Sequence, residues 1–66
     1  MSVNPGEKLK DLRISKGLTQ KQLAMSIGVE AAAVANYESG LRVPRDETKK
    51  KIAKVFGKSV EAIFFE

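Results

Sequence analysis

The chain has 66 residues, enough for one small domain, and contains neither cysteine nor histidine. Disulfides and thiolate metal sites are therefore excluded, and the commonest metal ligand and general base is missing. We expect no enzymatic activity, no metal and no cofactor. The formal net charge of +4 favours an anionic partner, although such a charge also serves solubility alone.

Membrane and export signals are missing from the sequence. No apolar run approaches the roughly 18 residues of a membrane span, and the first ten residues hold no signal-peptide core. We therefore expect a cytoplasmic protein with no membrane partner.

The first predicted helix spans about residues 5–16. Asn4 is typical of an N-cap residue, and Glu7 is placed to complete a capping box with it. Leu9 and Leu12 share one side of this helix, which we expect to be buried.

Two short helices joined by a glycine follow, over about residues 19–27 and 30–39. Thr19 can cap the first of them, and Gly28 can adopt the positive φ angle of a tight turn. Small and apolar residues recur on the facing sides of the two helices, at Leu23, Ala24, Ile27, Val34 and Tyr37. This pattern predicts a helix-turn-helix over about residues 19–40, whose second helix is held out to enter a DNA groove.

The remainder of the chain predicts a connector and two more helices. Residues 41–45 leave the helix, since Pro44 cannot continue one. A fourth helix is expected over residues 46–56, with its inner side formed by Thr48, Ile52, Val55 and Phe56. A last short helix follows over residues 60–64. The predicted fold class is therefore all-α, with five helices in one domain over residues 1–66.

Charge is distributed unevenly around the predicted helix-turn-helix. Residues 1–29 carry five basic and two acidic groups, residues 30–47 two and four, and residues 48–66 five and two. The regional charges are thus +3, −2 and +3. A positive field comes from the flanks of the motif, not from its second helix.

Several separated motifs match one known family. The stretches GLTQKQLAMSIGV, YESG, PR and KIAKVFGKSVEAIF occur in the same order and register as in helix-turn-helix regulators of the lambda-repressor and Cro type, also called the XRE family. The chain resembles this family from about residue 8 to residue 64. The resemblance implies a lambda-repressor-like fold and a transcriptional regulator, a repressor, that binds double-stranded DNA.

The resemblance also implies which residues face the DNA backbone. In this family the N-terminus of the second helix and the loop after the third contact phosphates, which helix-terminal amides and basic side chains attract. The residues at these positions are Thr19, Gln20, Lys21, Ser39, Gly40, Arg42 and Arg45. Thr19 can instead be only a helix cap, and the arginines can be solvated loop charges, with Arg45 paired to Glu47.

A structural ion pair is implied as well. Arg13 and Glu38 match a pair that, in several relatives, forms a partly buried contact between the first and third helices. We expect both residues to stabilise the fold.

The resemblance places a second group of residues at the base edges of the major groove. These are Gln20, Ala31, Ala32, Ala35 and Asn36. Many relatives carry larger polar residues at the first of the third-helix positions, whereas here only Asn36 can make a bidentate hydrogen bond and the alanines offer methyl contacts to thymine. Glu30, where relatives often have a Ser or Thr cap, adds repulsion near DNA. Specificity therefore depends partly on DNA shape and Gln20, or DNA binding is weak.

The sequence is compatible with two functions. The first is a homodimer on a pseudo-palindromic operator, with half-sites about 10–10.5 bp apart or a multiple of it. Its predicted dimer interface consists of Val60, Ile63 and Phe65, although Ile63 alternatively belongs to the monomer core. The second is a protein-interaction module, antitoxin-like, that binds a regulator or toxin through the alanine face and binds DNA weakly. We expect no small-molecule substrate and no effector pocket.

Overall fold

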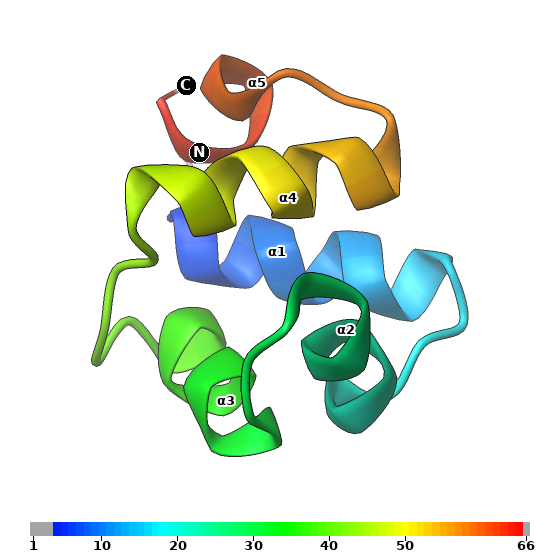
Figure 1. Cartoon of the computed structure of the whole chain (residues 1–66). Helices are drawn as coiled ribbons and strands as arrows, with labels where there is room; N and C mark the ends of the chain where they lie inside the picture. Colours follow the sequence, from blue (N-terminus) through cyan, green and yellow to red (C-terminus); the bar gives the residue numbers. More distant parts are fainter. Residues whose placement is uncertain (1–3, 66) are drawn as a thin grey trace.

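The computed structural model describes residues 4–65, which form five α-helices and no strand (Figure 1). The helices are α1 (Pro5–Ser15), α2 (Gln20–Ile27), α3 (Ala31–Ser39), α4 (Asp46–Phe56) and α5 (Val60–Phe64). The predicted all-α class with five helices is confirmed. Three predicted ends shift by one residue, because Lys16, Thr19 and Glu30 are capping residues outside α1, α2 and α3.

Local hydrogen bonds explain where the first two helices begin. The Asn4 side chain accepts from the amide of Glu7 at 2.9 Å, but within residues 4–65 the Glu7 side chain makes no return bond. At α2 the capping box is complete. Thr19 Oγ1 accepts from the Gln22 amide at 3.0 Å, and the Thr19 amide donates to Gln22 Oε1 at 2.8 Å.

The turn between α2 and α3 depends on one glycine. Gly28 caps α2 with φ 72°, and its amide donates to the carbonyl of Ala24. A residue with a Cβ adopts this left-handed conformation at a cost, whereas glycine does not. The short turn allows α3 to begin close to the end of α2, and the two helices pack against each other.

The core lies between the helices and receives side chains from all five. It consists of Leu9, Leu23, Ala24, Ile27, Ala33, Val34, Tyr37, Ile52, Ala53, Ile63 and Phe64. The inner side of α4 agrees with the prediction at Ile52, which is buried, and at Val55 and Phe56, which are half-buried and pack against the core. Ala53, which the prediction did not include, is also buried. α4 packs against both α2 and α5.

Helices α1 and α3 approach each other closely at Gly6. A Cβ atom built on Gly6 would lie 2.5 Å from the carbonyl oxygen of Glu38 and 2.6 Å from that of Tyr37. Real Cβ atoms do not come this close to backbone oxygen, so only glycine fits. The C-terminal backbone of α3 therefore rests directly on the first turn of α1.

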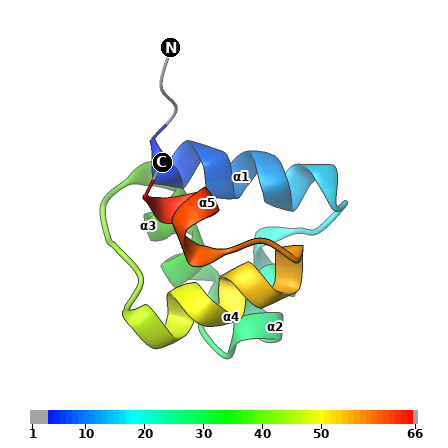
Figure 2. The same ribbon diagram turned by 90° about the horizontal axis from the view of Figure 1, so that it is seen from above.

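The arrangement of the helices separates two ends of the molecule. α2 and α3 lie at one end and α5 at the opposite end, with α1 and α4 between them (Figures 1 and 2). In the part of the chain that the structure describes, no helix has the length and apolar character needed to cross a membrane.

Candidate nucleic-acid interface

The exposed start of α2 is the first part of the candidate interface. Its capping box satisfies the amides of Thr19 and Gln22. The amides of the two residues between them, Gln20 and Lys21, have no acceptor within the helix, because the first turn of an α-helix has no preceding carbonyls. These amides and the helix dipole favour an anion at this end.

A buried ion pair holds α1 and α3 together beneath this helix start. Arg13 Nε lies 2.6 Å from Glu38 Oε2 and Arg13 Nη2 lies 3.2 Å from Glu38 Oε1. Only 11% and 4% of the two side chains are exposed. Arg13 Nη1 also donates to the carbonyl of Leu18 at 2.8 Å. The pair implied by the sequence is present, and it also anchors the loop between α1 and α2.

The side chain of Gln20 joins the same network. Its Nε2 donates to Glu38 Oε1 at 3.1 Å, and the residue is half-buried. From the sequence, Gln20 is predicted to contact DNA alone, at a phosphate or a base. The structure shows that part of its amide is engaged inside the protein, which a linear sequence gives no means of detecting.

The outer surface of α3 consists of small, uncharged side chains. Ala32 is exposed, whereas Ala31, Ala35 and Asn36 are half-buried. Ala31 packs against the core and so offers less of its methyl group to a groove than predicted. Glu30 is exposed and makes no side-chain capping bond, which leaves its carboxylate at the start of the helix.

The loop after α3 is held by one backbone carbonyl. The carbonyl of Asn36 accepts from Ser39 Oγ and from the amide of Arg42, both at 3.2 Å. Gly40 ends the helix with φ 81°. This local bonding fixes the position from which the basic part of the loop departs.

Two arginines of this loop lie together. Arg42 and Arg45 are exposed and line one hollow of about 280 Å³, together with Val29 and Thr48. The alternative pair between Arg45 and Glu47 does not form among residues 4–65. Both guanidinium groups therefore remain accessible to an anion.

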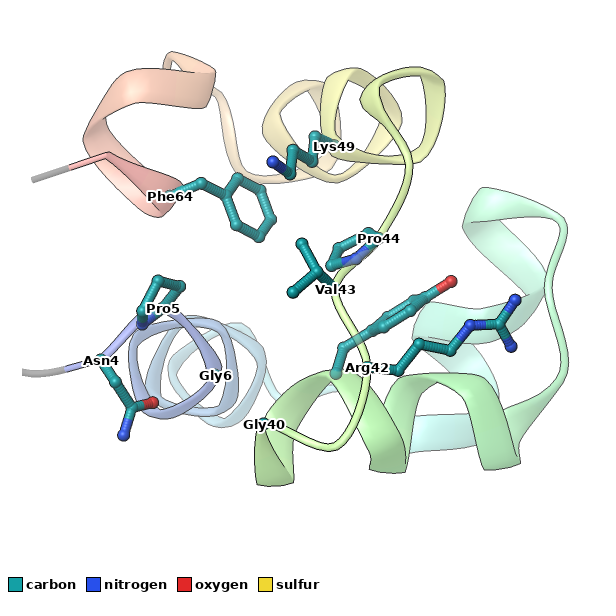
Figure 3. Close-up of a pocket in the computed structure, with 10 residues that line it drawn as sticks. Asn4, Pro5, Gly6, Gly40, Arg42, Val43, Pro44, Lys49 and Phe64 are labelled. Carbon is teal, nitrogen blue, oxygen red and sulfur yellow. The ribbon is translucent and has the colours of Figure 1, made fainter.

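A second hollow, of about 350 Å³, lies between the start of α1, the loop after α3 and the end of α5. Pro5, Val43 and Phe64 point toward one another across it, and the guanidinium of Arg42 is directed away (Figure 3). The segments that form this hollow lie far apart in the chain, so the sequence does not indicate it.

The end of α5 corrects one predicted dimer residue. Ile63 is 1% exposed and belongs to the core of the monomer, so its side chain is not available to a second subunit. Val60 is half-buried, and Phe65 is 64% exposed. The ammonium of Lys49 lies 4.7 Å from the centroid of the Phe65 ring. Of the three predicted residues, Phe65 is the one with a large accessible surface.

Comparison with known proteins agrees with this geometry. A family model described as helix-turn-helix (HTH_3) matches residues 9–63. The chain is 40% identical over 57 residues to the HTH-type transcriptional activator BcrR of Enterococcus faecalis, covering 86% of this chain and 28% of BcrR. It is also 40% identical over 50 residues to the cryptic phage CTXphi transcriptional repressor RstR of Vibrio cholerae, covering 76% of this chain and 45% of RstR.

The chain thus spans less than half the length of these two relatives. Among solved structures, the P22 c2 repressor in complex with a synthetic operator superimposes with a TM-score of 0.93 over 97% of both chains, at 20% identity. That likeness establishes the fold, and the family model covers most of the sequence. The chain belongs to the helix-turn-helix family of the lambda-repressor and Cro type.

Proposed function

We propose that the protein is a sequence-specific transcriptional regulator that binds double-stranded DNA as a homodimer, on a pseudo-palindromic operator. The observation that supports this most is the α2–α3 unit, in which the outer surface of α3 lies between a helix N-terminus and a loop with two accessible arginines. A regulator bound to its operator excludes other proteins from that stretch of DNA, so DNA binding by this domain would be sufficient for repression.

Backbone contacts and base contacts have different sources in this proposal. The helix start at Thr19 and the loop arginines Arg42 and Arg45 hold the phosphates and set the register, without reading sequence. α3 enters the major groove, where Asn36 matches adenine and the alanine methyl groups match the thymine methyl. Direct readout is sparse, so DNA shape supplies a further part of the specificity.

The proposal is tested by selecting DNA sites from a random pool and measuring affinity against salt. A regulator of this kind enriches one motif with two-fold symmetry. Its affinity falls steeply with salt, because bound cationic groups release phosphate counterions. If no motif is enriched and salt has little effect, the DNA-binding function is wrong.

Replacing Asn36 with alanine is expected to relax the preference at one base pair of each half-site by about 1–3 kcal/mol. The reason is the loss of the one bidentate hydrogen-bonding side chain on the outer surface of α3. Arg42→Ala is the matched control, since loss of a phosphate contact weakens binding to all sequences alike and lowers the salt slope by about 1. A uniform effect of Asn36→Ala would remove Asn36 from base readout. Both variants are measured by competition binding.

Replacing Phe65 with serine is expected to weaken self-association without unfolding the monomer. Phe65 is 64% exposed, so the monomer loses little buried apolar surface. Ile14→Ser is the control, because Ile14 is 56% exposed on α1, outside the predicted interface. Analytical ultracentrifugation measures association and far-UV circular dichroism reports folding. An unchanged dimer, or a dimer lost equally in the control, would place the interface elsewhere.

A protein-interaction module is the second candidate. Two aliphatic side chains in the loop after α3, Leu41 and Val43, are 81% and 71% exposed. Together with the alanine surface of α3 and the acidic Glu30, they suit a protein surface better than a phosphate backbone. The site selection described above separates the two candidates.

A further inference from the structure

The carboxylate of Glu38 makes contacts beyond its pair with Arg13. Its two oxygens receive three hydrogen bonds, two from the Arg13 guanidinium and one from Gln20 Nε2. Only 4% of the Glu38 side chain is exposed. A carboxylate held by a guanidinium accepts hydrogen bonds and donates none. A side chain that contacts Glu38 Oε1 must therefore present a hydrogen-bond donor to it.

This requirement decides how the amide of Gln20 is turned. The oxygen and nitrogen ends of a glutamine amide are similar in size, and the hydrogen-bond network determines which end points where. Next to Glu38, only the NH₂ end is compatible. Gln20 Oε1 makes no hydrogen bond within residues 4–65, so it is left, together with the second N–H, for an outside partner.

Gln22 provides the opposite case on the same helix. Its Oε1 accepts from the Thr19 amide at 2.8 Å, so its NH₂ group is the end left over. Two glutamines in the first turn of α2 are thus held in opposite orientations by different partners. The orientation of each is set by the protein and not by solvent.

We propose that Glu38 is a positioning residue that orients Gln20 to read an adenine. This inference rests on the proposed DNA-binding function. The Oε1 acceptor of Gln20 and the remaining N–H of its Nε2 match the N6 donor and the N7 acceptor that adenine presents in the major groove. A phosphate has no donor and would leave Oε1 unmatched. Because Glu38 already restricts the amide, little conformational freedom is lost when the base is bound.

The test compares Gln20→Ala, Glu38→Gln and the double variant by site selection and competition binding with the full chain. The amide of a glutamine at position 38 can both donate and accept, so it permits either orientation of Gln20. Gln20→Ala is expected to lower the preference for adenine at one base pair by about tenfold, the discrimination of one bidentate contact. Glu38→Gln is expected to lower the preference at the same base pair, and the double variant is expected to lower it no further than Gln20→Ala does.

Other results overturn the proposal. If Glu38→Gln weakens binding to all sequences equally, Glu38 is only structural. If Gln20→Ala has a uniform effect, Gln20 contacts phosphate. If Gln20→Ala and Glu38→Gln change the preference at different base pairs, Glu38 does not act through Gln20.

A measurement on the unchanged protein keeps the proposal testable if Glu38→Gln does not fold. In NMR spectra of the free protein, the side-chain NH₂ of Gln20 is expected to exchange with solvent more slowly than that of Gln22. Equal exchange would show that Glu38 does not hold Gln20. If no DNA site is enriched, the adenine contact fails with the proposed function, whereas slow exchange at Gln20 would still support positioning by Glu38.

Discussion

Replacing Glu38 with alanine is expected to destabilise the protein by about 3–5 kcal/mol. The Arg13 side chain is only 11% exposed, and the variant lacks the carboxylate that neutralises it, so a buried charge is left unpaired. A chain of 66 residues has a total unfolding free energy of roughly 3–10 kcal/mol. The expected loss is therefore a large fraction of the total, and at the lower end of this range it is enough to unfold the variant. Urea denaturation followed by circular dichroism measures the loss.

The control for this prediction is Glu61→Ala, which removes an exposed glutamate and should change stability by about 0.5 kcal/mol or less. A second variant tests the cause. Replacing both Arg13 and Glu38 with methionine removes both buried charges, and it should be more stable than Glu38→Ala. If Glu38→Ala costs less than about 1 kcal/mol, the pair behaves as a solvated surface contact.

Replacing Gly6 with alanine is expected to destabilise the protein by about 1–3 kcal/mol, although alanine is the better helix former. The new methyl group would lie 2.5 and 2.6 Å from two backbone oxygens of α3, neither of which can rotate away as a side chain does. α1 and α3 must therefore separate, which also loosens the contacts of Leu9 in the core.

Thermal and urea denaturation measure this effect, and Lys10→Ala is the matched control. Lys10 is exposed on the same helix, so its replacement tests alanine propensity without the close approach. The control is expected to be neutral or slightly stabilising. Equal stability of the Gly6 variant and the control would mean that α1 and α3 do not approach at this point.

The helix boundaries could be predicted because they depend on neighbouring residues. Thr19 with Gln22 forms the expected capping box, and glycines 28 and 40 end α2 and α3 in the left-handed conformation. Each of these features involves a few consecutive residues, whose geometry the sequence specifies directly. The helix-turn-helix was therefore recognisable before any packing was known.

Features that depend on distant segments could not be predicted in the same way. Gly6 read as part of a helix start, because nothing in the sequence places it against the backbone of Glu38. For Ile63 the sequence leaves a dimer interface and the monomer core open, since an apolar side chain at this position suits both, and only the packing places it in the core. The orientation of Gln20 depends on a contact 18 residues away.

The separation along the chain between helices that contact each other has a consequence for folding kinetics. α2 packs on α3, and α4 on α5, across short connections, so these pairs close small loops at low entropic cost. The contact between α1 and α5 includes a bond from Lys8 Nζ to the carbonyl of Ala62, 54 residues apart. Mainly local contacts are typical of chains that fold within microseconds to milliseconds. The junction of α1 with α5 demands the longest closure, and it is the step to which the folding rate should be most sensitive.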